Sequence, residues 1–161
     1  MKKFTILLVF FVALFVTQLS AQGYKSAIGV RSLSTSISGL QVSSYNVSGK
    51  LFINPRNAVE GVVGFYSVLG YTSLNVAAFY QIHTSITKVE GLNWYIGGGP
   101  GIILASGSLG IQIIGNLGLD YKFKEIPLNV SIDFTPSLSI SPSPIQFFPV
   151  GFGFAARYVL N

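Results

Sequence analysis

Apolar and polar residues alternate strictly over residues 128–140. Every even position is apolar, from Leu128 to Ile140, and every odd position is polar. A period of two predicts an extended strand with one apolar and one polar face. Strands of soluble proteins usually end after about 5–6 residues, whereas a tilted strand that crosses a bilayer needs about 9–11. The length of this alternation therefore predicts a strand that spans a membrane.

Less regular alternation divides the rest of the chain into further strands. Turn signals rich in Pro, Gly and Asn separate them most clearly at 54–57, 84–91 and 124–127. We expect strands at 24–34, 43–53, 58–69, 73–83, 92–104, 109–123, 127–140 and 146–160. An even number of similar strands with short connections predicts an all-β fold, an eight-stranded antiparallel up-and-down transmembrane β-barrel.

The first 21 residues have the layout of a secretory signal peptide. Lys2 and Lys3 precede an apolar run at 4–16, and Ser20 and Ala21 form a small-residue cleavage site before Gln22. The alternative is a membrane anchor, but the run is shorter than the roughly 20 residues of a helical span. We therefore expect a signal peptide at 1–21 and one barrel domain at 22–161, located in the cell outer membrane with the termini on the periplasmic side.

Alternation alone does not say which face of the strands points inward. A soluble, lipocalin-like carrier of an apolar ligand would also alternate, with its apolar face inside. An eight-stranded barrel encloses space only for side chains or one small ligand. Six or seven large apolar side chains from each strand would not fit there, whereas the Gly, Ser and Asn of the polar face would. We therefore expect the apolar face to contact lipid.

Composition excludes several classes of protein. Charged residues make up 9% of the chain, against about 25% in soluble domains. After removal of Lys2 and Lys3, eight Lys/Arg and five Asp/Glu remain, without a basic cluster, so nucleic acid is not an expected partner. The chain contains no cysteine, which excludes disulfides and thiol metal sites. No cofactor or metal site is predicted.

Several charged residues fall on the polar, inward-facing side of the predicted strands. We expect them to form a polar network in the lumen, and a small ion path is the alternative. The members of this network are Arg31, Lys50, Glu60, Asp120, Lys122, Asp133 and Arg157. If Ile53 opposes Asn57 in the hairpin at 53–57, then Lys50 opposes Glu60, which predicts a cross-strand ion pair.

Aromatic residues cluster near the ends of the predicted strands, where a membrane girdle requires them. At the periplasmic ends we expect a girdle formed by Tyr24, Tyr80, Trp94, Tyr121 and Tyr158.

His83 is the single histidine of the chain. His83, Ser85 and the nearby Glu90 resemble the His-x-Ser arrangement of outer-membrane lipid A deacylases. A catalytic triad needs a base within hydrogen-bond reach of the hydroxyl and a group that orients the base. The match covers two residues at a periplasmic turn, so we expect a turn-capping histidine and predict no catalytic residue.

Three segments resemble small outer-membrane barrels of Gram-negative bacteria, of the porin-like OmpX and OmpA-barrel type, especially those of Bacteroidetes. They are the signal end at 20–22, the strand start at 89–99 and the segment at 121–128. The resemblance implies a monomer in outer-membrane lipid, placed there by the barrel-assembly machinery. Such barrels often end in an aromatic residue, whereas this chain ends in Asn161, so that either recognition rests on Tyr158 or the chain assembles less typically.

Three functions are compatible with these patterns. The expected one is a non-enzymatic barrel that supports the envelope or presents a surface. The alternatives are a lipid-modifying enzyme of the outer membrane and the soluble carrier.

Overall fold

The computed structural model describes residues 24–37, 40–68, 71–105, 107–141 and 145–160. The predicted signal peptide lies outside the described residues. None of the described residues forms a helix long and apolar enough to cross a membrane.

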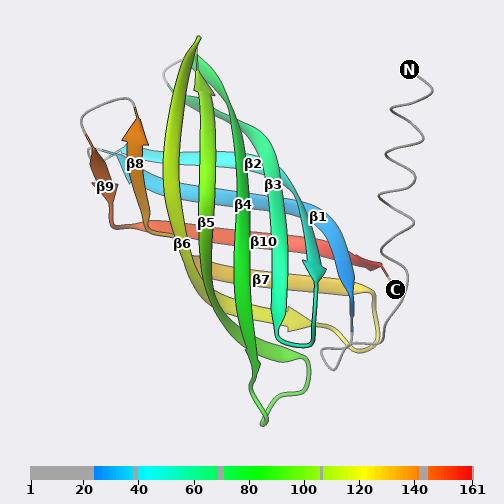
Figure 1. Cartoon of the computed structure of the whole chain (residues 1–161). Helices are drawn as coiled ribbons and strands as arrows, with labels where there is room; N and C mark the ends of the chain where they lie inside the picture. The colour runs from blue at the N-terminus through cyan, green and yellow to red at the C-terminus, as the bar shows by residue number, and fades with distance from the viewer. Residues whose placement is uncertain (1–23, 38–39, 69–70, 106, 142–144, 161) are drawn as a thin grey trace, which may run out of the picture.

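Ten strand segments form one antiparallel sheet that closes on itself (Figure 1). The segments are β1 (Ser26–Ile37), β2 (Leu40–Phe52), β3 (Asn57–Val68), β4 (Tyr71–Ser85), β5 (Leu92–Ala105), β6 (Ser108–Lys122), β7 (Leu128–Phe134), β8 (Ser137–Ser141), β9 (Gln146–Phe148) and β10 (Gly151–Leu160). From β1 to β6 each strand pairs with the next in chain order. β6 then pairs with both β7 and β8, β7 pairs with β10, and β8 pairs with β9. β10 pairs with β1 from Ser26↔Leu160 to Thr35↔Gly151, which closes the barrel. The predicted eight-stranded antiparallel barrel is confirmed.

Two of the eight predicted strands are interrupted by proline. The predicted strand 127–140 is the pair β7 and β8, separated by Thr135 and Pro136, and 146–160 is β9 and β10, separated by Pro149 and Val150. The ladder continues from Thr135↔Gly151, where the Thr135 N–H donates to the Gly151 carbonyl at 2.8 Å, to Ser137↔Phe148. The strand made of β9 and β10 therefore has one extra residue, which is a β-bulge. The bulge lies at the prolines, which have no N–H to donate to the ladder.

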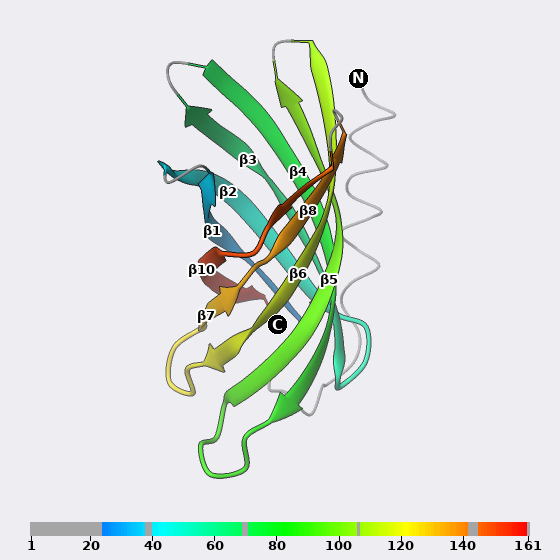
Figure 2. The same ribbon diagram turned by 90° about the vertical axis from the view of Figure 1, so that its left-hand side faces the viewer.

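The barrel has two distinct ends. We call the end where β1 begins and β10 stops the terminal end; it also carries the connections at 53–56, 86–91 and 123–127. The opposite end, where β1 joins β2, β3 joins β4, β5 joins β6 and β8 joins β9, is the distal end. The β8–β9 hairpin runs along the distal wall and diverges from the β1–β2 hairpin (Figure 2).

The distribution of side chains is the reverse of that in a soluble protein. Large apolar residues lie outside, such as Ile132 with 57% of its surface exposed, whereas Arg31 and Glu60 inside are 1% and 0% exposed. Along β10 every odd position is buried, and the even positions are exposed or half-buried. The alternation in the sequence therefore sorts apolar groups outward and polar groups into the lumen.

Two apolar layers cross the inside of the barrel. The layer at the terminal end consists of Tyr24, Ala27, Phe52, Ala58 and Val159. The layer nearer the distal end consists of Val62, Ala77, Phe79 and Ile114, with Leu33 packed against them. Charged and polar side chains fill the lumen between these layers.

Candidate functional site: a charged lumen below an open cavity

Arg31 joins two carboxylates inside the barrel. Its Nη2 donates to both carboxylate oxygens of Asp133 at 2.7 and 2.8 Å, and its Nη1 donates to Glu60 Oε1 at 3.1 Å. The guanidinium also lies over the ring of Phe79, 5.4 Å from the ring centroid. The hydroxyl of Tyr95 donates to Asp133 as well. The inward parity of β1, β3, β5 and β7 brings these groups to one level of the lumen.

Arg157 has partners on both sides of the lumen. Its Nε donates to Ser48 Oγ at 2.8 Å, and its Nη1 donates to Asn129 Oδ1 at 3.0 Å and to Ser131 Oγ at 3.1 Å. Its Nη2 forms an ion pair with Glu60. The Arg157 side chain thus links β10 to β2, β3 and β7. It can do so because the planar guanidinium presents five donors in fixed directions.

Lys50 and Asp120 form a third ionic contact, with Lys50 Nζ 2.7 Å from Asp120 Oδ2. The other carboxylate oxygen of Asp120 accepts hydrogen bonds from Asn129 Nδ2 at 2.7 Å and from the Tyr24 hydroxyl at 3.3 Å. The predicted register is confirmed, since Lys50 pairs with Glu60 in the β2–β3 ladder. The two side chains form only the longest ion pair of the network, at 4.0 Å.

Together these contacts define what we call the lumen network. Its charged members are Arg31, Lys50, Arg157, Glu60, Asp120 and Asp133, three basic and three acidic. Their side chains have no exposed surface. Buried charges are stable only when they are paired and hydrogen-bonded. The balance of charge and the density of contacts therefore make this level of the lumen a packed layer.

The structure places Lys122 outside the lumen network. The residue is half-buried at the terminal end, where it lines a pocket with Lys124 and Glu90. Lys122 has the inward parity of Asp120, but it is two residues nearer the end of the barrel, beyond the reach of the paired charges. The position of Lys122 in the alternation predicts which face of the strand it lies on, but not how far along the barrel axis it lies.

The expectation that Tyr24 belongs to an external girdle is wrong. Tyr24 is 3% exposed, packs edge-on against Phe52 with ring centroids 5.0 Å apart, and donates to Asp120. It precedes β1 and turns into the lumen, where it covers the lumen network from the terminal end. Three of the other proposed girdle residues, Tyr80, Trp94 and Tyr158, are on the outer face, and Tyr121 is half-buried beside Phe123.

His83 is a lumen residue and does not cap a turn, which corrects our expectation. Its ring is fully buried between the rings of Phe52 and Tyr95, with centroids 4.8 and 4.9 Å away. Its Nε2 lies 3.2 Å from Gln81 Oε1, whereas the Ser85 hydroxyl donates to Asn93 at 2.9 Å. The histidine and the serine therefore have different hydrogen-bond partners, and the two residues do not form a nucleophile–base pair.

Several uncharged members of the lumen network were not among the predicted site residues. Ser48, Gln81, Tyr95 and Asn129 each bond a charged side chain. Their parity places them on the inward face, so the signal was present in the sequence. Only the arrangement of strands around the barrel shows which charge each one meets.

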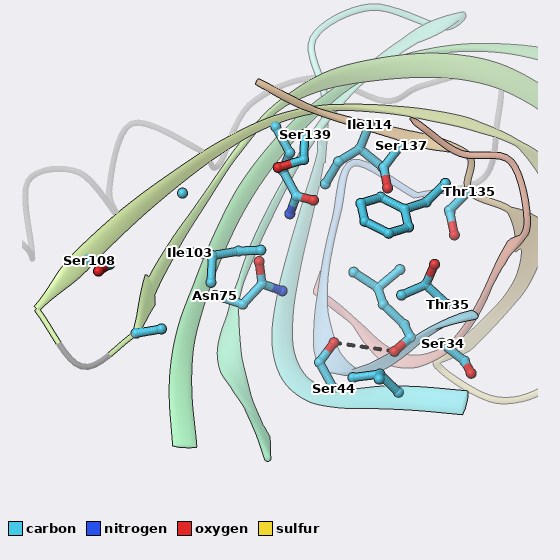
Figure 3. A pocket seen from close by; sticks show the side chains of 16 residues that line it. Ser34, Thr35, Ser44, Asn75, Ile103, Ser108, Ile114, Thr135, Ser137 and Ser139 are labelled. Carbon is cyan, nitrogen blue, oxygen red and sulfur yellow. Dashed lines mark hydrogen bonds between the residues drawn. The ribbon is translucent and has the colours of Figure 1, made fainter. Parts of the chain in front are cut away.

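The distal end contains a cavity of about 340 Å³ (Figure 3). Apolar residues of its wall include Leu33, Ile103 and Ile114, and uncharged polar residues include Asn75 and Thr135. Ile114 and Leu33 also belong to the distal apolar layer, which separates the cavity from the lumen network. The sequence contains no signal for this cavity, because residues of seven strands, β1, β2, β4, β5, β6, β8 and β9, form its wall.

Comparisons with known proteins give fold relatives only. No protein family matches the sequence, and no curated protein matches it. The N-terminal β-barrel domain of Pseudomonas aeruginosa OprF superposes with a TM-score of 0.56 at 14% identity, covering 85% of this chain and 98% of that domain. Neisserial surface protein A superposes with a TM-score of 0.56 at 11% identity, covering 89% of this chain and 100% of that chain. Both are outer-membrane barrels, and the likeness shows that this chain has their fold.

Proposed function

We propose that this chain is a non-enzymatic barrel of the bacterial outer membrane, with a structural role in the envelope or a small surface for interaction. The observation that carries the proposal is the apolar outer face of the closed barrel. Val47, Ile132 and Phe154 are each more than half exposed, at 59%, 57% and 56%. A surface of this kind is unfavourable in water and favourable in lipid.

The lumen supports a structural role over a transport role. The lumen network and the two apolar layers fill the barrel between its terminal end and the distal cavity. Barrels that conduct freely have about 16–18 strands, whereas eight strands leave space only for side chains. The short distal connections argue against a large adhesive surface, since binding residues usually lie on loops.

Orientation follows from the usual form of such barrels, with the termini and short turns in the periplasm. The exposed charges support it, because Arg56, Lys88, Lys124 and Glu125 all lie at the terminal end. In this proposal the chain is a monomer surrounded by outer-membrane lipid, and the barrel-assembly machinery inserts it after export.

Cell fractionation tests the location. The full chain, expressed in a Gram-negative host, should sediment with outer membranes in a density gradient and stay there in high salt. A variant with Val9→Arg in the apolar run at 4–16 is the control and should not be exported. Recovery of the unmodified protein from the periplasm without detergent would overturn the proposal.

Deletion of the gene tests the role. Loss of an envelope-supporting barrel should increase the uptake of a membrane-impermeant dye, and expression of the full chain should reverse the increase. The chain with His83→Phe should restore the barrier equally well, since the ring acts by packing. A change in the lipid composition of the outer membrane that follows His83→Phe would instead favour the lipid-modifying enzyme.

A further inference from the structure

The distal cavity has the size and the lining of a small-molecule site. Its volume of about 340 Å³ lies at the lower end of the roughly 300–1,000 Å³ of ligand pockets. Leu33, Val42 and Ile103 offer apolar contacts, and Ser44 and Gln112 offer hydroxyl and amide groups. The Ser44 hydroxyl is already bonded to the Leu33 carbonyl at 3.3 Å (Figure 3). The wall is therefore amphipathic.

No charge surrounds this cavity. Residues 32–49, 61–82, 96–119 and 134–156, which make up the distal part of the chain, contain no Asp, Glu, Lys, Arg or His. The nearest charged residues are those of the lumen network, which are paired with one another. An ionic ligand would lose its hydration in the cavity without gaining a counter-charge. The lining thus selects for an uncharged molecule.

One buried acceptor in the cavity wall has no partner. Asn75 is 5% exposed, and its Nδ2 donates to Asn46 Oδ1 at 3.1 Å. Its Oδ1 accepts no hydrogen bond from the part of the chain that the structure describes. Asn75 points into the cavity beside Ile103 (Figure 3). A buried acceptor without a donor is unfavourable, so the hydroxyl of a ligand would be stabilised there.

The barrel wall next to the cavity is incompletely paired. The ladder between β1 and β10 ends at Thr35↔Gly151, where the Thr35 hydroxyl donates to the Val150 carbonyl at 3.0 Å. Beyond this point β9 pairs with β8, and β1 pairs with β2, with no ladder between β1 and β9 among the described residues. We call this unpaired stretch of the wall the seam. Thr35 and Thr135 lie at the side of the cavity opposite Asn75 (Figure 3).

We propose that the distal cavity binds a neutral amphiphile from the surrounding membrane. Its hydroxyl-bearing head group donates to Asn75 Oδ1, and its alkyl chain passes the apolar wall near Leu33 and leaves through the seam into lipid. The seam gives access only to a barrel that is in a bilayer, so the inference rests on the proposed membrane location.

A titration in lipid nanodiscs tests the proposal, with 1-monolauroylglycerol as the probe. Methyl resonances of Ile103 and Ile114 report on the cavity, and those of Ile102 and Ile132 report on the lipid, because these two side chains are exposed on the outer face. We expect saturable shifts of the first pair and only gradual, non-saturating shifts of the second. Dodecyl phosphate and dodecyltrimethylammonium have the same chain length with charged head groups, and should give no saturable shift.

Two variants locate the site. Ile103→Trp fills the cavity and should abolish the saturable shift of Ile114, whereas Ile102→Trp, on the outer face of the same strand, should leave it unchanged. Asn75→Leu should weaken binding about fivefold, the effect of one neutral hydrogen bond. Chemical shifts of the barrel backbone show that each variant is folded.

The outcomes separate the two proposals. A protein that does not enter nanodiscs or float with vesicles contradicts the membrane location. A folded, inserted protein without a saturable shift overturns the cavity proposal alone. Equal binding of dodecyl phosphate, or binding unchanged by Ile103→Trp, would overturn it as well.

Discussion

Lys50 Nζ lies 2.7 Å from Asp120 Oδ2, although the two residues are 70 positions apart and on strands that are not neighbours. Glu60, which pairs with Lys50 in the adjacent strand, is farther from it, at 4.0 Å. The charge of Asp120 is balanced mainly by Lys50, because the other hydrogen-bond partners of Asp120 are the neutral side chains of Asn129 and Tyr24. Glu60 is already bonded to Arg31 and Arg157. The ion pair across the lumen is therefore more important to Lys50 than the pair along the sheet.

Double-mutant cycles should separate these two contacts. We expect the cycle of Lys50→Met with Asp120→Asn to give a coupling in the upper part of the range of about 0.5–3 kcal/mol, and Lys50→Met with Glu60→Gln a coupling in the lower part. The measurement is the free energy of unfolding by urea in lipid vesicles. A larger coupling to Glu60 than to Asp120 would contradict the cross-lumen arrangement.

Removal of Arg157 should be among the costliest single changes. Arg157→Met leaves Glu60 without one cation and leaves Ser48, Asn129 and Ser131 without a donor, so we expect a loss of about 3–5 kcal/mol in unfolding free energy. Lys124→Met is the control, since Lys124 pairs with Glu90 on the exposed terminal end. Exposed pairs contribute about 0–1 kcal/mol. Similar losses for the two variants would show that the lumen charges are hydrated.

Two neighbouring residues on β7 should differ in how much their substitution destabilises the barrel. Ile132 is 57% exposed on the outer face, and Ile132→Arg should cost about 2–4 kcal/mol if this face contacts lipid. Ser131 points inward and accepts from Arg157, so Ser131→Ala should cost about 1 kcal/mol. Unfolding in lipid vesicles measures both. If Ile132 faced water, an arginine at this position would cost little. Equal costs for Ile132→Arg and Ser131→Ala would therefore contradict the assignment of Ile132 to the lipid-facing surface.

The barrel should not conduct like an open channel. The lumen network and the apolar layers occupy the path between the ends, and eight strands leave no space for an aqueous pore. Planar-bilayer recordings of the purified chain should show no large, stable conductance. A steady current through the unmodified chain, equal to that through the Arg157→Met variant, would contradict the prediction. It would show that the lumen network does not block the lumen.

The sequence predicted the faces of the strands more reliably than the depth of a side chain. Parity alone placed Arg31, Asp133 and Arg157 on the inward face, and the hairpin at 53–57 set the correct Lys50–Glu60 register. The contacts across the lumen depend on the stagger of strands around the closed barrel, which no local pattern encodes. Thus Asp120 could not be recognised as the closer partner of Lys50.

Two errors have local causes. Pro136 occupies an apolar position in the alternation of 128–140, so the alternation predicts one continuous strand, whereas a proline, which has no N–H, interrupts the ladder between β7 and β8. For Tyr24, the preference of aromatic residues for the membrane interface predicts the outer face, and this prediction is wrong. Tyr24 lies before β1, where strand parity no longer determines the direction of a side chain.

The most direct test of the account is the topology of the barrel in cells. The chain has no cysteine, so that single cysteines can be introduced at Ser108, at the distal end, and at Glu125, at the terminal end. An impermeant maleimide should label Ser108→Cys on intact cells, and Glu125→Cys only after the outer membrane is permeabilised. Labelling of both sites only after permeabilisation, with the protein recovered from the periplasm, would contradict a barrel that spans the outer membrane.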